Sequence, residues 1–132
     1  MKIFFLFLSL SFATLSWASN PLIRNCRLAG GEFFVVTTDS DELPLCQFGN
    51  SYVGALDVMN YSLKLSSSES LLAFLLGEKL CSGKKIEVKE LHGPRVLTLC
   101  EFGDQSLIDM TTLQSGIESR QNQALLNFLK SK

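Results

Sequence analysis

Histidine is nearly absent from this sequence of 132 residues, and neither sign of charge dominates it. His92 is the single histidine, and 12 lysines and arginines face 13 acidic residues, for a net charge of −1. With one histidine and no Cys-x-x-Cys pair, we expect neither a zinc site nor a histidine-based catalytic centre. The balanced charge leaves no basic surface for nucleic acid, so we expect no nucleic-acid partner.

Long apolar runs are also missing. The longest, residues 3–12, follows Lys2, contains two serines, and falls short of the roughly 20 residues that span a bilayer. Ser16-Trp17-Ala18 places small residues at positions −3 and −1 of a cleavage after residue 18. This pattern predicts a signal peptide over residues 1–18 and export to the periplasm or the exterior. We expect no transmembrane segment after cleavage; the alternative is an uncleaved anchor.

The rest of the chain has the composition of a folded domain. Apolar residues make up 46% of the sequence and charged residues 19%, and removal of the leader leaves 132 − 18 = 114 residues, enough for one modest core. Four cysteines in an exported chain predict two disulfide bonds. Counting alone leaves three pairings of Cys26, Cys46, Cys81 and Cys100 open.

An internal repeat organises these cysteines. The segment 46–50, CQFGN, is similar to 100–104, CEFGD, and each segment follows an upstream cysteine by 46 − 26 = 20 or 100 − 81 = 19 positions. Glycines and then a strand-like run follow each upstream cysteine. The repeat predicts two tandem units, residues 19–65 and 66–132.

Local patterns place the elements of each unit. Asn20 and Pro21 are favourable at a helix start, and Ser66 with Glu69 fits a capping box. Alternating and β-branched runs predict two hairpins. The expected helices are 21–29, 71–80 and 119–130, and the expected strands are 32–38, 43–48, 85–89 and 96–102.

The predicted fold class is therefore α+β, with two tandem helix–β-hairpin units, a disulfide within each unit, and a C-terminal helix. We predict the bonds Cys26–Cys46 and Cys81–Cys100, which fasten the end of each helix to the returning strand. Pairings between the units, 26 with 81 or with 100, remain alternatives.

The first unit resembles a known family. Asn20-Pro21, Cys26 and Gly30-Gly31, followed by Cys46-Gln47-Phe48, resemble the DUF333 family of small exported bacterial proteins, in a diverged and duplicated form. That family often carries the label hemolysin, so the resemblance implies action on membranes, although the label explains no residue of this chain.

The resemblance covers residues 20–62 and weakens toward its end. The third and fourth cysteines of the family fall at Gly54 and near Lys64, and Asp57 stands where the family has tryptophan. Loss of both late cysteines implies that the first two bond each other, which supports Cys26–Cys46 independently of the repeat.

No residue pattern predicts a catalytic, cofactor or metal site. His92 lies in a turn signal, and the acidic turn formed by Asp39, Asp41 and Glu42 is typical of a solvated loop. Asp57 and Asp109 recur after the two repeats, where they could form hydrogen bonds within each unit or pair with each other. The predicted site residues are the four structural cysteines.

The function predicted from these observations is that of an exported, non-enzymatic binding or envelope-associated protein, with an unidentified protein or envelope partner and no cofactor. One alternative is a protease inhibitor that presents 39–44 or 91–95 as a rigid loop. Others are a membrane-active, hemolysin-like factor and an uncharacterised hydrolase. The sequence predicts no oligomeric state.

Overall fold

The computed structural model describes residues 20–132, so the predicted signal peptide lies outside the described residues. Within this range the chain forms five α-helices, one short 3-10 helix at Arg120–Asn122, and six strands. The helices are α1 (Pro21–Leu28), α2 (Ala55–Ser62), α3 (Glu69–Leu75), α4 (Met110–Ser115) and α5 (Gln123–Lys130). The strands are β1 (Glu32–Thr37), β2 (Glu42–Phe48), β3 (Ser51–Gly54), β4 (Lys84–Glu90), β5 (Val96–Glu101) and β6 (Leu107–Asp109).

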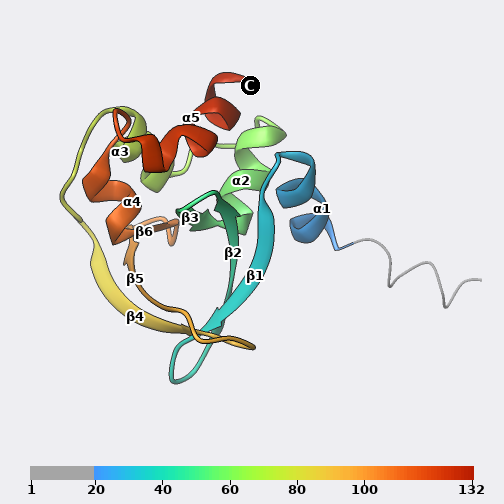
Figure 1. Ribbon diagram of the computed structural model, residues 1–132, viewed down its shortest axis with the longest axis vertical. Coiled ribbons are helices and arrows are strands. Elements are labelled where there is room, and N and C mark those ends of the chain that lie inside the picture. Colours follow the sequence, from blue (N-terminus) through green and yellow to red (C-terminus); the bar gives the residue numbers. More distant parts are fainter. Residues whose placement is uncertain (1–19) are drawn as a thin grey trace, which may run out of the picture.

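The six strands form one closed antiparallel barrel, in the order β1-β2-β3-β6-β5-β4, with β4 returning to β1. Figure 1 shows the strands as a ring, with most of the helices gathered along one side of it. The prediction of two tandem helix–β-hairpin units is therefore wrong. Separate hairpins would leave unpaired backbone groups along their edges, whereas the pairings β1–β4 and β3–β6 satisfy those groups.

The short strands β3 and β6 join the two halves of the barrel. Cys46 of β2 pairs with Val53 of β3, Cys100 of β5 pairs with Ile108 of β6, and Val53 and Ile108 pair with each other. The strand order is unchanged when β1, β2 and β3 are exchanged with β4, β5 and β6. Residues of the two halves can therefore be matched through their strand pairing.

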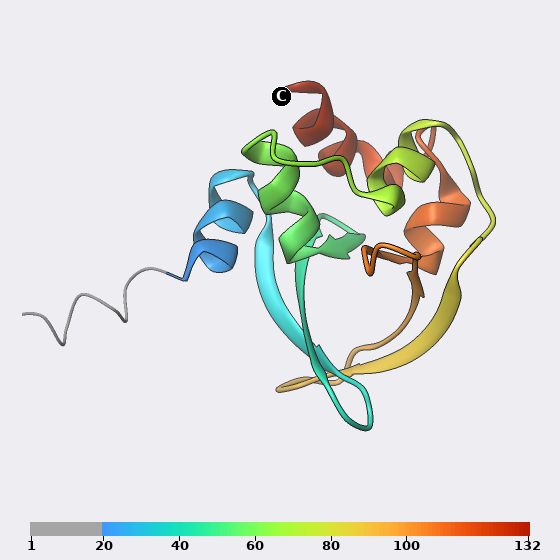
Figure 2. The ribbon, with the colours of Figure 1, turned by 180° about the vertical axis from the view of Figure 1, so that it is seen from behind.

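Strand side chains alternate between two faces of the barrel. One cluster combines strand residues with residues of all five helices. Figure 2 shows these helices outside the ring of strands, so this cluster lies on the outer face of the barrel. The second cluster contains only strand residues, so it fills the inside of the barrel; its members are Val36, Leu45, Val88, Leu99 and Leu107, with Phe34, Leu43, Ile86 and Leu97 packed against them. In the apolar run 33–36, Phe33 packs with the helices, and Phe34 and Val36 lie inside the barrel.

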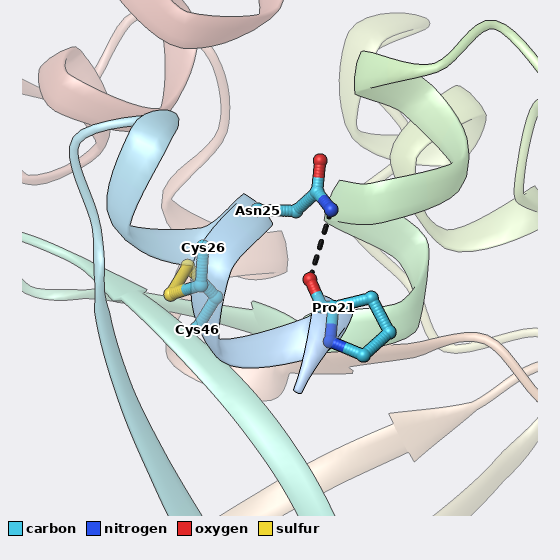
Figure 3. Close-up of a disulfide and its surroundings, with 4 residues drawn as sticks. All are labelled: Pro21, Asn25, Cys26 and Cys46. Atoms are coloured by element: carbon cyan, nitrogen blue, oxygen red, sulfur yellow. Dashed lines mark hydrogen bonds between the residues drawn. A yellow bond between two sulfur atoms is a disulfide. The ribbon is translucent and has the colours of Figure 1, made fainter. Parts of the chain in front are cut away.

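The two disulfide bonds predicted for the chain are present, and they join Cys26 to Cys46 and Cys81 to Cys100. Figure 3 shows the first of them fixing α1 against β2. A side chain on Gly31 would collide with Cys46 Sγ, so a glycine is required where the chain passes this bond.

Helix boundaries follow local chemistry, with three departures from the prediction. One is that the expected helix 119–130 is divided into a 3-10 helix at Arg120–Asn122 and α5. The Asn20 side chain accepts a hydrogen bond from Leu22 N–H and caps α1, as expected. The predicted helix 71–80 ends early, because Gly77 adopts a φ of 79° that no helix can continue. The residue at the start of α3 is Ser68, so the predicted capping box at Ser66 is wrong.

Candidate functional site

The two ends of the barrel interior differ in how they are filled. Leu43 lies near the start of strand β2 and Gln47 lies near its end. Each is two residues from Leu45, which lies inside the barrel, so the side chains of Leu43 and Gln47 also face inward. We call the end near Gln47 the Arg95 end, after the residue that fills it. We call the opposite end, near Leu43, the open end.

Arg95 fills its end of the barrel from the turn between β4 and β5. Its guanidinium carbon lies 4.1 Å from the centre of the Phe34 ring and 5.7 Å from that of Tyr52. The guanidinium donates to Glu90 Oε1 at 2.8 Å and Oε2 at 3.0 Å, and to Gln47 Oε1. The cation is therefore stacked, paired and hydrogen-bonded within the chain.

The charges at the Arg95 end stabilise each other. The hydrogen bond from Arg95 holds the pKa of Glu90 below its usual value, and the same contact raises the pKa of Arg95. Both groups therefore stay ionised across the physiological pH range. The Arg95 side chain turns inward, so it does not project from the 91–95 loop.

The open end contains a cavity of about 570 Å³. This volume is within the range of roughly 300–1,000 Å³ that is usual for ligand sites. Inner-face residues Leu43, Glu101 and Leu107 line it, so it reaches the barrel interior. The remaining lining residues are Leu22, Asp41, Pro44, Leu56, Asp57, Asn60, Ser66, Ser67, Ser68, Asp104 and Gln105.

Strand pairing identifies the residues that correspond at the two ends. Gln47 pairs with Tyr52, as Glu101 pairs with Leu107. Phe34 and Ile86 correspond in the same way, through their partners in β2 and β5. Thr38 N–H binds the Asp41 carbonyl as Glu90 N–H binds the Arg95 carbonyl. The corresponding pairs are thus Gln47 and Glu101, Tyr52 and Leu107, Phe34 and Ile86, Arg95 and Asp41, and Glu90 and Thr38.

These exchanges explain why one end is open. Phe34 and Tyr52 are replaced by the smaller Ile86 and Leu107, and the long cation Arg95 is replaced by the short Asp41. Of these residues, Leu107 and Asp41 line the cavity, so their smaller size leaves volume there, and the exchange of arginine for aspartate adds an acidic group to it. Within residues 20–132, no lysine, arginine or histidine lines it.

Asp57 is the most buried acid of the cavity. It lies in the first turn of α2, is 7% exposed, and its Oδ2 accepts a hydrogen bond from Leu107 N–H at 2.9 Å. Burial raises its pKa to about 7, the Leu107 bond opposes this rise, and the charge of Asp104 adds to it. A side chain on Gly54 would collide with the Asp57 carboxylate, so glycine is needed beside it.

Two further acids, Asp104 of the cavity lining and Asp109 outside it, hold local structure. Asp104 accepts hydrogen bonds from Glu69 N–H, Ser106 N–H and the Ser106 hydroxyl. Burial would raise its pKa, but these bonds outweigh burial and lower it. Asp109 caps α4 through Thr112 N–H; burial raises its pKa although these bonds oppose the rise.

Sequence reasoning located some of these residues and missed their grouping. His92 and the acidic turn residues are exposed, as expected. Asp109 forms a bond within its own half, but Asp57 binds across to β6. The cavity itself was missed, because it depends on closure of the barrel through two short strands.

Two further features bear on the candidate site. In the chain from residue 20 onward, no three acidic, histidine or cysteine side chains converge in a way that could hold a metal ion. None of the described helices combines the length and the apolar character needed to cross a membrane.

Comparisons of the chain with protein-family models, with curated protein sequences and with solved structures found no match. The resemblance to DUF333 therefore stays a prediction from sequence, and the candidate site is interpreted from its own geometry.

Proposed function

We propose that this chain is an exported, disulfide-stabilised protein that binds a partner at the open end of its barrel and has no catalytic role. The observation that carries this proposal is the difference between two ends of one barrel. Arg95 fills one end with a group of the chain itself, whereas a cavity of about 570 Å³ remains at the other.

Export is supported by the cysteines and by the predicted leader. Both disulfide bonds are internal, and no cysteine among residues 20–132 is free. Such bonds persist in oxidising compartments and are reduced in the cytosol. They also connect α1 to β2 and the segment before β4 to β5, which holds the barrel in one shape and limits the entropy lost on binding.

A binding role is supported by the composition of the cavity. Apolar residues such as Leu22 and Leu56 contribute contact area, and polar groups from α2 and the loops contribute direction. His92, the one histidine, lies in the β4–β5 turn and does not line the cavity. Asp57, whose pKa is raised, already accepts a backbone hydrogen bond through Oδ2.

A pair of matched variants tests this proposal. Leu56 lines the cavity and is 51% exposed, whereas Leu63, just beyond the end of α2, is 53% exposed and lies outside the cavity. Oxidised wild-type protein, Leu56→Arg and Leu63→Arg would each be used to capture partners from the envelope and culture fluid of the source organism. We expect wild type and Leu63→Arg to retain a partner that Leu56→Arg loses. Equal capture by all three proteins would contradict a site at the open end.

A further inference from the structure

The Arg95 end shows which chemical group the inside of this barrel accommodates. There a guanidinium stacks on Phe34, and carboxylate and amide oxygens of Glu90 and Gln47 accept its N–H groups. The site is built from inner-face strand residues and one turn.

The open end has the corresponding backbone frame without a cation. At the position of Gln47 it has Glu101, a stronger acceptor for a cation, and at the position of Arg95 it has Asp41. Leu107 and Leu43 supply apolar inner surface beside them. This end therefore has negative charge, apolar walls and free volume where the other end has a filled cation site.

We propose that the open end binds an arginine side chain of a partner peptide, in the place that corresponds to the one Arg95 occupies at the other end. The proposal rests on the binding function proposed above and names the chemistry of its ligand. Charge complementarity favours a cation, because four carboxylates and no basic side chain of the described chain line the cavity.

The carboxylates of the open end differ in their freedom to bind. Among residues 20–132, the side chains of Asp41 and Glu101 make no ion pair, since the two ion pairs are Lys79–Glu118 and Arg95–Glu90. Asp104 is occupied by Glu69 and Ser106. Asp41 and Glu101 are therefore the carboxylates we assign to the guanidinium, which binds such groups through two parallel hydrogen bonds.

Asp57 is a further carboxyl group of the cavity lining. Its Oδ2 is held by Leu107 N–H, and its Oδ1 has no hydrogen-bond partner in the described chain. Within the described chain, no three of the carboxylates come together in a way that could hold a metal ion. Leu22 and Leu43 line the same cavity and offer apolar surface to the stem of an arginine side chain.

Titration of the oxidised, ¹⁵N-labelled protein with short peptides tests the ligand class. The probes are Ac-Ala-Arg-Ala-NH₂, the same peptide with norleucine in place of arginine, and butylguanidinium. We expect the arginine peptide and butylguanidinium to shift the amide signals of Leu107 and Asp57 saturably, and the norleucine peptide to bind at least about tenfold more weakly. Equal binding by the norleucine peptide would overturn the charge argument, and binding by butylguanidinium but not by the arginine peptide would overturn the peptide as its source.

Matched variants locate the contact. Asp41→Asn and Glu101→Gln remove the assigned charges, and Asp39→Asn and Glu87→Gln make the same changes at exposed positions outside the cavity. We expect each of the first two to weaken binding by about tenfold, the usual effect of one charged hydrogen bond, and the controls to leave it unchanged. Unchanged amide spectra away from the site would show that all four variants fold.

Failure here is distinguishable from failure of the proposed function. If no probe binds but capture of a partner still depends on Leu56, the arginine proposal is wrong and the binding function stands. If the arginine peptide binds with full strength to the Asp41→Asn and Glu101→Gln variants, the assigned site is wrong.

Discussion

Asp57 and Thr112 occupy corresponding positions in the two halves of the barrel, and each accepts a hydrogen bond from a strand of the other half. Asp57 is three residues beyond the N-cap of α2, and Thr112 is three residues beyond the N-cap of α4. Asp57 Oδ2 accepts from Leu107 N–H at 2.9 Å, and Thr112 Oγ1 accepts from Tyr52 N–H at 3.1 Å. These reciprocal contacts hold β3 and β6 beside the helices that follow them.

The Asp57 contact predicts a specific pH dependence of stability. Because burial raises the pKa of Asp57 from 3.8 to about 7, the folded protein binds more protons than the unfolded chain between these values. The contribution of Asp57 to stability is therefore present at low pH and is lost as the pH rises through about 7. We expect Asp57→Asn, which keeps the acceptor for Leu107, to stabilise the protein by about 2 kcal/mol at pH 8 and to have little effect at pH 4.

Urea unfolding of wild type and Asp57→Asn across pH 4–8 measures this difference. Asp39→Asn, at an exposed turn position, serves as the control and should follow wild type at every pH. A difference between wild type and Asp57→Asn that does not grow with pH would show that the Asp57 carboxyl does not titrate in this range.

Arg95 should matter for stability because its loss empties the filled end of the barrel. Arg95→Ala removes the stacking on Phe34 and leaves Glu90 half-buried without its partner. We expect a loss of about 1–3 kcal/mol in the free energy of unfolding and a return of the pKa of Glu90 toward its usual value. Urea unfolding and NMR titration of Glu90 measure the two effects, and a variant with neither would contradict the geometry of this end.

Asn122 is the centre of a buried polar network between the barrel and the C-terminal helices. Its amide donates to the carbonyls of Thr112 and Gly116, and its Oδ1 accepts from the Ser51 hydroxyl. Replacement by alanine leaves buried groups without partners, so we expect Asn122→Ala to cost about 2–4 kcal/mol. Asn127→Ala, on the exposed side of α5, should cost less than about 1 kcal/mol by the same unfolding measurement.

The two disulfide bonds should differ in their reduction rates. Cys26, Cys46 and Cys100 are fully buried, whereas Cys81 is partly exposed and lines a surface depression with Leu80. Because a thiolate must reach a sulfur atom in line with the bond, a native-state pulse of dithiothreitol should open Cys81–Cys100 first. Alkylation and peptide mapping would follow the order, and prior loss of Cys26–Cys46 would contradict the burial of that bond.

The sequence predicted local elements better than their assembly. Asn20-Pro21 located α1, and the alternation in 85–89 located β4, because caps and periodicity are local properties. Strands β3 and β6 are four and three residues long, too short for a periodic signal, and the closure of the barrel depends on them. Separate units were therefore predicted where one barrel forms.

The candidate site could not be predicted from the sequence for the same reason. Its residues come from α1, α2, three strands and three connecting segments, and no local pattern joins these parts of the chain. The signal in the sequence that bears on the site is the internal repeat. Once the strand pairing is known, the positions at which its two copies carry different residues, Gln47 or Glu101 and Arg95 or Asp41, show how the two ends differ.

Exposure of two corresponding inner positions tests the asymmetry of the barrel most directly. Leu43 and Leu97 occupy corresponding positions at the two ends. The sequence has one tryptophan, at position 17, so a protein of residues 19–132 has none. In this protein, the fluorescence of Leu43→Trp and of Leu97→Trp each reports the exposure of one end. We predict that acrylamide quenches the tryptophan at position 43 several-fold more than the one at position 97, and that the arginine peptide protects only position 43. Equal quenching at both positions, or protection at neither, would contradict a barrel with one filled end and one open, ligand-binding end.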